Sequence, residues 1–226
     1  MSANPQTSLR RVNQGWLAGP ERRALDWLAP RLPRSLTPGR LTALGLLGAV
    51  LTLVGYLLAI RHPAALWLVN LGLLVNWFGD SLDGAVARLR GVERPRYGFF
   101  LDQSTDVVAQ ALFSLGLGLS GYIRPEIVGA GFAAFLMMTV QSLLRAEVTD
   151  EFHLAAGKMG LTELRCLFVI MNVLFYLVPP QPFQWAAMTL TYADVLGTAW
   201  ILGTLYLYGM TMLAELRRLN AEDDRT

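Results

Sequence analysis

Long apolar runs recur along this chain and are separated by short polar connections rich in arginine. Residues 41–60 carry no charge, and they are long enough to cross the hydrocarbon core of a membrane, which takes about 20 predominantly apolar residues. Five further runs follow, at approximately 64–78 with a continuation into an aspartate-bearing stretch, 97–121, 126–144, 161–178 and 185–213. The pattern predicts an all-α polytopic membrane protein with six transmembrane helices.

The segment before the first run has a different pattern. Leu25, Leu28 and Leu32 recur at helical spacing on one face of residues 21–32, with arginines elsewhere. A solvated helix is one interpretation, but we expect an amphipathic helix that lies on the cytoplasmic leaflet. Thr37-Pro38 is typical of the cap and first turn of a helix. The predicted organisation is a cytoplasmic N-terminal segment (1–37), a six-helix transmembrane catalytic domain (38–216) and a cytoplasmic tail (217–226).

Composition and charge support the membrane interpretation and add an orientation. The 226 residues are 54% hydrophobic and 16% charged, whereas soluble domains are about 25% charged. A net charge of +2 is too small to indicate a nucleic-acid partner, and the single Cys166 excludes an internal disulfide. All of the 19 lysines and arginines except Arg61 and Arg124 fall on one predicted side. The positive-inside rule therefore places both termini and the loop around Arg90 in the cytoplasm, at the inner membrane if the source is bacterial.

Four aspartates interrupt the apolar pattern. Asp80 and Asp83 share one face of a helix, and Asp102 and Asp106 share one face of the next. Because the connection between these helices is short, we expect antiparallel neighbours whose aspartate faces meet near the cytoplasmic end. Each buried charge would cost about 2.5–3.5 kcal/mol in a membrane, so the group needs cations. Carboxylate oxygens suit Mg²⁺ or Mn²⁺, which complete their coordination with water and substrate phosphates.

Small residues accompany the carboxylates. Gly84, Ala87 and Gly98 lie on the aspartate-bearing faces, and Arg88 is adjacent. Each small residue alone would equally indicate helix packing. Together with the carboxylates and the arginine, they predict a flat, diphosphate-containing ligand that lies against the backbone beside a metal.

The combined motif resembles the signature of the CDP-alcohol phosphotransferases, and it reads Asp80-x2-Asp83-Gly84-x2-Ala87-Arg88-x9-Gly98-x3-Asp102-x3-Asp106. The resemblance implies an integral membrane enzyme of phospholipid biosynthesis that transfers a substituted phosphoryl group from a CDP-linked donor to an alcohol and releases CMP. It implies a homodimer as well. It also implies that Asp80, Asp83 and Asp102 hold two divalent cations and that Asp106 is a metal ligand or the catalytic base. Gly84, Ala87, Arg88 and Gly98 would lie against the nucleotide. Pro38-Gly39 departs from the Pro-Asn pair that the family often shows.

The sequence leaves the substrates open. Arg145, Lys158 and Arg165 could bind the phosphate of a phosphorylated acceptor, although the positive-inside rule also accounts for them. The stretch 160–165 is similar to a segment of choline and ethanolamine phosphotransferases, so the donor is either CDP-diacylglycerol or a CDP-amino alcohol.

Two other classes of protein were compared with this pattern. A membrane prenyltransferase also binds a magnesium diphosphate through aspartates, but it needs two motifs far apart in the chain. A non-enzymatic cation transporter needs an acidic path across the whole membrane, and the first run has no ionisable group. The phosphotransferase interpretation accounts for more of the sequence than either.

Overall fold

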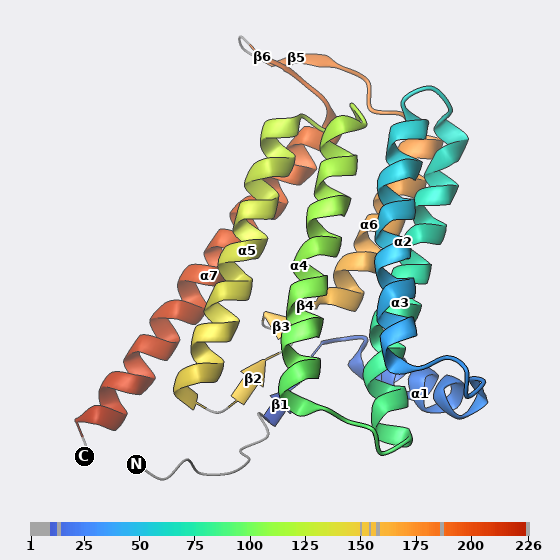
Figure 1. Ribbon diagram of the computed structural model, residues 1–226. Helices are drawn as coiled ribbons and strands as arrows, with labels where there is room; N and C mark the ends of the chain where they lie inside the picture. The colour runs from blue at the N-terminus through green and yellow to red at the C-terminus, as the bar shows by residue number, and fades with distance from the viewer. Residues whose placement is uncertain are drawn as a thin grey trace.

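The computed structural model describes residues 10–12, 15–149, 151–153, 155–156, 159–185 and 188–224, and this part of the chain is mostly helical (Figure 1). Its helices are α1 (Ala18–Leu28), α2 (Pro38–Ala59), α3 (Leu66–Leu89), α4 (Pro95–Leu119), α5 (Pro125–Thr149), α6 (Leu161–Leu177) and α7 (Tyr192–Asp223). Short 3-10 turns at Ala29–Arg31 and Pro63–Ala65 follow α1 and precede α3.

In this described part, short strands occur before α1 and in the connections between helices. Strand β1 (Arg10–Val12) pairs in parallel with β2 (Glu151–His153). Strand β3 (Ala155–Ala156) pairs antiparallel with β4 (Met159–Gly160), and β5 (Phe183–Trp185) pairs antiparallel with β6 (Met188–Leu190). The strands are too short to form a core of their own, so the helices determine the architecture.

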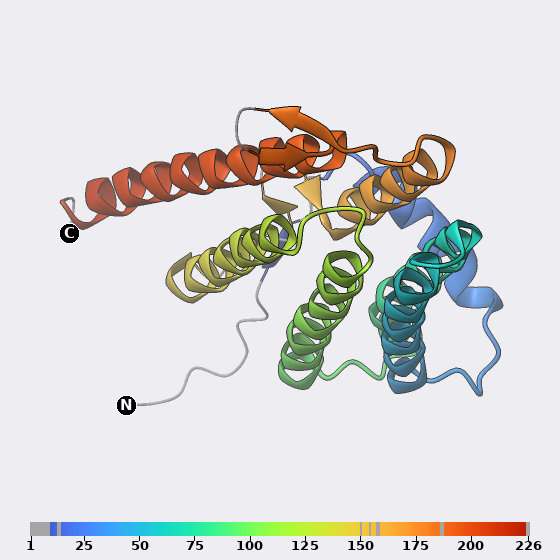
Figure 2. The same cartoon turned by 90° about the horizontal axis from the view of Figure 1, so that it is seen from above.

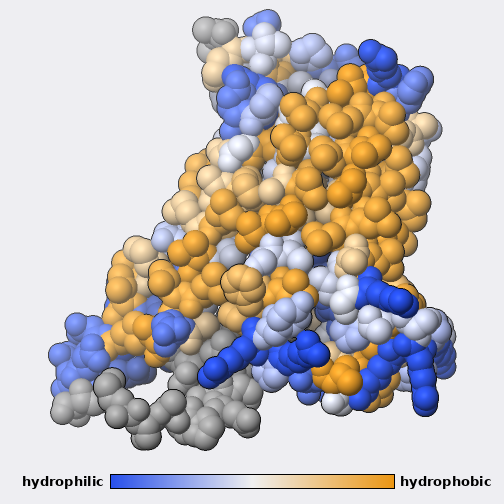
Figure 3. Space-filling view, in the orientation of Figure 1, coloured by the Kyte–Doolittle hydropathy of each residue, from blue (hydrophilic) through white to orange (hydrophobic). Residues whose placement is uncertain are grey.

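Four helical segments are long and apolar enough to cross a membrane, namely Pro38–Ala59, Pro63–Leu89, Pro125–Val148 and Tyr192–Asp223. Helix α6 has only 17 residues, and the first half of α4 is polar because it carries Asp102 and Asp106. Figure 3 shows a broad apolar band on the viewed face, with hydrophilic residues at both ends. The protein is therefore a helical membrane protein, and its six-span count stays a prediction.

The tightest contact in the bundle joins α2 and α3, which pack together more extensively than any other pair of described elements. A Cβ atom added at Gly79 would lie 2.3 Å from the backbone nitrogen of Gly45, and one added at Gly48 would lie 2.4 Å from that of Asn76. Glycine therefore allows the two backbones to touch. This contact brings the aspartate-bearing end of α3 against α2.

The other helices are arranged around this pair. Helix α4 packs against α2 more than against α3, α6 packs on α3, and α5 lies between α4 and α7 (Figures 1 and 2). The expected antiparallel helices α3 and α4 are thus joined by a short connection, but α2 is the close partner of both. Figure 2 shows α7 extending away from the rest of the bundle.

Helix α1 packs its leucines on protein. Leu25, Leu28 and Leu32 contact a buried cluster at the ends of α2 and α3 that contains Leu41 and Leu82. The leucine face is therefore partly covered by the protein's own helices. The interfacial position of α1 remains a prediction.

Arg90, at the C-terminal end of α3, binds the linker from α1 to α2. The Arg90 guanidinium donates to the carbonyl oxygens of Leu36 at 2.7 Å, Pro33 at 3.1 Å and Leu32 at 3.3 Å. These bonds tie the linker to the end of α3, close to the connection that leads to α4.

Candidate active site

The four aspartates gather where α3 and α4 approach the same end of α2. Asp83 interacts electrostatically with Asp80 and Asp102, and Asp106 interacts with the same two carboxylates. The expected convergence of the two aspartate faces is therefore present. Since both helices pack on α2, that helix also contributes side chains to the site.

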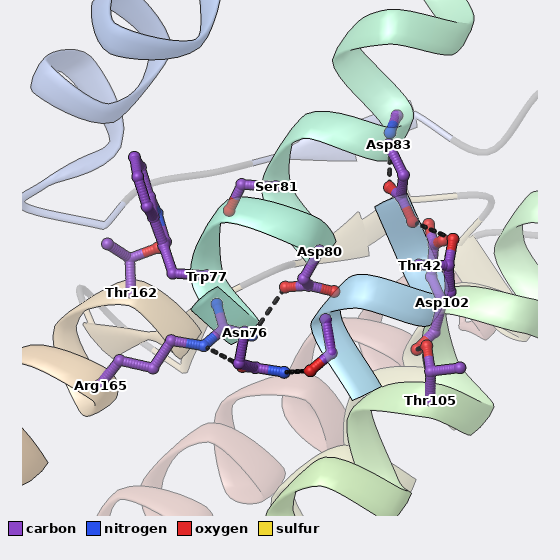
Figure 4. Close-up of polar contacts among 12 residues, drawn as sticks. Thr42, Asn76, Trp77, Asp80, Ser81, Asp83, Asp102, Thr105, Thr162 and Arg165 are labelled. Carbon is purple, nitrogen blue, oxygen red and sulfur yellow. Dashed lines mark hydrogen bonds and ion pairs between the residues drawn. The ribbon is translucent and has the colours of Figure 1, made fainter. Parts of the chain in front are cut away.

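Asp83 is buried and is held by α2 (Figure 4). The Thr42 hydroxyl donates to Asp83 Oδ2 at 2.6 Å, and the backbone N–H of Gly84 donates to Oδ1 of the same carboxylate. Charge-assisted bonds of this kind stabilise a buried carboxylate. Sequence reasoning missed Thr42 because nothing near it in the chain points to Asp83.

Asp80 is paired with an arginine from α6. Arg165 Nη2 lies 2.7 Å from Asp80 Oδ2, and Arg165 Nε donates to Asn76 Oδ1 at 2.9 Å. Asn76 Nδ2 in turn donates to the Gly45 carbonyl oxygen at 3.0 Å. The guanidinium is buried, and its charge compensates the carboxylates around it. Asn76 was also missed, although it lies one helical turn before Asp80 on the same face.

A small cavity opens between α2, α3 and α4. It is lined by Thr42, Gly45, Leu46, Asn76, Asp80, Thr105 and Asp106. Two of the four predicted aspartates thus border it directly, together with three uncharged polar side chains. The cavity places carboxylate oxygens beside hydroxyl and amide groups, and these oxygen donors suit a hard cation rather than a bare phosphate.

The predicted nucleotide residues are not among the residues that line this cavity. A Cβ atom at Gly84 would lie 3.4 Å from Arg88 Nη1, so this exposed arginine folds back over the glycine. A Cβ atom at Gly98 would have no neighbour within 4 Å, and Ala87 is half-buried. The space around Gly98 is not explained by close helix packing.

The three basic residues proposed for an acceptor phosphate have different surroundings. Arg165 contacts Asp80, whereas Arg145 Nε lies 3.3 Å from Glu215 Oε2 of α7. Lys158 lies outside the described residues. The structure therefore brings Arg165 to the aspartates and gives Arg145 a partner on a different helix.

The donor chemistry of the site fits a hard divalent cation, since it consists of carboxylate oxygens with hydroxyl and amide groups nearby. Within the described ranges, however, no three acidic, histidine or cysteine side chains are arranged to hold a metal ion. Asp80 and Asp83 are instead directed to Arg165 and Thr42. Coordination by either carboxylate would require it to share or exchange these donors.

Fold and site together define a helical membrane protein with a carboxylate cluster at one end of its bundle. The sequence model of the CDP-alcohol phosphatidyltransferase family matches residues 32–200, and the chain belongs to this family. The resemblance seen in the aspartate motif is thereby confirmed. The family is generally dependent on divalent cations.

A relative of this chain is the archaetidylinositol phosphate synthase of Pyrococcus horikoshii. It is 31% identical to this chain over 122 residues, which are 52% of this chain and 64% of the relative. The chain thus spans a little under two thirds of that relative's length.

Proposed function

We propose that this protein is a CDP-alcohol phosphotransferase of phospholipid biosynthesis. It would transfer a substituted phosphoryl group from a CDP-linked donor to an alcohol acceptor and release CMP. The observation that carries the proposal is the gathering of Asp80, Asp83, Asp102 and Asp106 at one end of the bundle, with Asp80 and Asp106 lining a cavity, in a chain that belongs to the family.

In the proposed reaction the acceptor hydroxyl oxygen attacks the phosphorus that bears the substituent. The bond from this phosphorus to the bridging oxygen breaks, and CMP leaves with the electron pair. The hydroxyl proton passes to Asp106, because this carboxylate lines the cavity and a general base must lie within hydrogen-bond reach of its proton. The reaction needs no covalent intermediate.

We assign Asp80, Asp83, Asp102 and Asp106 as the residues that would hold Mg²⁺ or Mn²⁺, in two ions. Bound cations of this kind neutralise diphosphate charge and stabilise the departing phosphate. Gly84, Ala87, Arg88 and Gly98 would accommodate the nucleotide. The open space at Gly98 and the guanidinium beside Gly84 support this assignment.

A phosphorylated polyol is the first candidate acceptor, with a CDP-linked lipid as its donor. The name of the archaeal relative describes synthesis of a lipid inositol phosphate, and the buried Arg165 offers a guanidinium beside the cavity. A neutral acceptor with a CDP-amino alcohol donor is the second candidate, from the similarity of residues 160–165 to choline and ethanolamine phosphotransferases. The proposal also includes cytoplasmic termini and active site, and a homodimer.

The first experiment removes one carboxylate. Asp83→Asn should lower CMP release at least about 100-fold, and excess EDTA should abolish it in the unchanged protein. Thermal stability should hold or rise, because like-charge repulsion is relieved while Thr42 can still donate to the amide oxygen. Asp26→Asn, an exposed change on α1, is the control. Full turnover by Asp83→Asn or in excess EDTA would refute the metal-dependent proposal.

The second experiment identifies the acceptor. CDP-diacylglycerol with glycerol phosphate or inositol phosphate is compared with CDP-choline and diacylglycerol, and the lipid products are identified by mass spectrometry. With a phosphorylated acceptor, Arg165→Ala should raise the acceptor KM at least about tenfold, or about 1.4 kcal/mol. Arg145→Ala tests the rest of the pocket. A tenfold rise would place Arg145 in it, whereas an unchanged KM would leave Arg145 as a contact between α5 and α7.

A further inference from the structure

One carboxylate outside the aspartate site joins three helices. Glu21 of α1 accepts hydrogen bonds at Oε1 from the Thr162 hydroxyl of α6 at 2.6 Å, from Trp77 Nε1 at 3.0 Å and from the Ser81 hydroxyl at 3.1 Å. Trp77 and Ser81 both belong to α3. A single half-buried oxygen atom therefore connects α1, α3 and α6.

A second carboxylate makes the complementary connection from α6 back to α1. Glu163 accepts from the backbone N–H of Leu17, directly before α1, at 2.7 Å and from that of Gly160 at 3.0 Å. Each helix thus supplies an acidic side chain that binds the other near its first turn. We call Glu21 and Glu163, with the donors that they accept from, the α1–α6 latch.

The latch lies directly behind the aspartate site. Figure 4 shows Trp77, Ser81 and Thr162 gathered on the side of α3 that is turned away from Asp83 and Asp102. Ser81 follows Asp80 in the chain, and Thr162 precedes Arg165 by three residues, on the same face of α6. The segments that Glu21 joins are therefore those that carry the Asp80–Arg165 pair.

We propose that Glu21 is a positioning residue for the active site. By accepting hydrogen bonds from α3 and α6 together, it fixes the first turn of α6 against α3, so that Arg165 reaches Asp80 and Asn76. Helix α1 is then a structural part of the site. The effect on transfer rests on the proposed function, whereas the effect on Arg165 does not.

Two substitutions of Glu21 distinguish the effect of its hydrogen-bond acceptor from the effect of its negative charge. Glu21→Gln keeps a carbonyl oxygen that can accept the three hydrogen bonds, whereas Glu21→Ala removes the acceptor and leaves three donors without it. Asp26→Ala is the matched control, because Asp26 lies on the same helix, is exposed, and has its ion-pair partner, Arg22, on α1 itself at 4.0 Å.

The test measures amide hydrogen exchange and CMP release on the full-length protein in detergent. Glu21→Ala should speed exchange in α1 and in the first turns of α6 roughly tenfold, leave α5 unchanged, and lower CMP release roughly tenfold. Glu21→Gln should stay within about threefold of the unchanged protein in both measurements. Asp26→Ala should give the same exchange and CMP release as the unchanged protein. Normal exchange in Glu21→Ala would overturn the proposal, and so would faster exchange with unaltered CMP release.

A double-mutant cycle tests the route through Arg165. Glu21→Ala, Arg165→Ala and the double variant are compared in thermal midpoint and, where transfer is measurable, in CMP release. Glu21→Ala should cost less once Arg165 is absent, because the Arg165–Asp80 contact can be lost only once, although the three hydrogen bonds of Glu21 itself are lost in either background. Additive effects would overturn the proposal. If the unchanged protein releases no CMP, the proposed function fails, and the thermal cycle still decides whether Glu21 positions Arg165.

Discussion

The Thr42 hydroxyl has one hydrogen and two acceptors within reach. It lies 2.6 Å from Asp83 Oδ2 and 3.1 Å from the Pro38 carbonyl oxygen, so the shorter, charged contact is favoured. Thr42→Val keeps the shape and removes the donor. The buried carboxylate then loses a partner, so we expect a loss of about 1–3 kcal/mol in stability and roughly tenfold lower CMP release. Thermal unfolding measures the change in stability, and the transfer assay measures the change in CMP release.

The control for this change is Thr198→Val on α7. The Thr198 hydroxyl donates at 2.8 Å to the Asp194 carbonyl oxygen of its own helix, far from the aspartate cluster in sequence and on another element. Stability should change by no more than about 0.5 kcal/mol, and CMP release should be unaltered. Equal effects of the two valines would show that Thr42 has no particular relation to Asp83.

The contact between α2 and α3 gives a prediction in which two physical effects oppose each other. Alanine is a better helix former than glycine by about 1 kcal/mol, so propensity alone favours Gly→Ala in both helices α3 and α7. At Gly79, however, the new Cβ would lie 2.3 Å from the Gly45 backbone nitrogen, whereas at Gly203 it would have no neighbour within 4 Å. Gly79→Ala should therefore lower the thermal midpoint and the folded yield, and Gly203→Ala should preserve or raise both.

Size-exclusion chromatography and thermal unfolding in detergent compare the two alanine variants. An undiminished midpoint for Gly79→Ala would mean that α2 and α3 separate at little cost. The backbone contact between Gly79 and Gly45 would then not be the contact that holds Asp80 against α2.

The elements were predictable to different degrees. The helical spacing of Asp80 and Asp83 was sufficient to place both on one face, and the six apolar runs correspond to helices α2 to α7. The spacing of the leucines of α1 predicted an apolar face but not its partner, because an apolar stripe packs equally well on lipid or on another helix. The insertion of α2 beside both α3 and α4 could not be predicted either. It depends on backbone contact at Gly45, and a glycine in a membrane helix has many possible partners.

The site was predictable where its residues share a helix face. Asn76 carried such a signal, since it lies one turn before Asp80, but a lone asparagine is a weak one. Thr42 and Glu21 reach the site or its supporting helices only through tertiary packing, over sequence separations of 41 and 141 residues in the contacts with Asp83 and Thr162. No local pattern encodes these contacts.

The molecule as a whole has an orientation that labelling can test. In a Cys166→Ser background, single cysteines replace Arg94, Glu126 and Gln181, which lie at or near opposite ends of the long helices. With six spans, position 94 should react with an impermeant thiol reagent only from the cytoplasmic side, and positions 126 and 181 only from the other side, because the arginines concentrate around position 94. Sealed vesicles of both orientations provide the measurement.

The pair at 94 and 126 decides the status of α4, which with α6 is one of the two helices among α2 to α7 that are absent from the four apolar segments. Labelling of both positions from one side would mean that α4 does not cross. Permeabilised vesicles, in which all three cysteines should react, are the control for accessibility.

Helix α7 is longer than a membrane is thick. Its 32 residues extend over about 48 Å at 1.5 Å per residue, against a hydrocarbon core of about 30 Å. The excess can be accommodated by tilt, or by letting the end that carries Glu215 and Arg218 project into the headgroups and water. Because α7 packs mainly on α5, a change in acyl-chain length can be accommodated by a change in the tilt of α7. Helices α2, α3 and α4 can then keep their positions relative to one another in the bilayer.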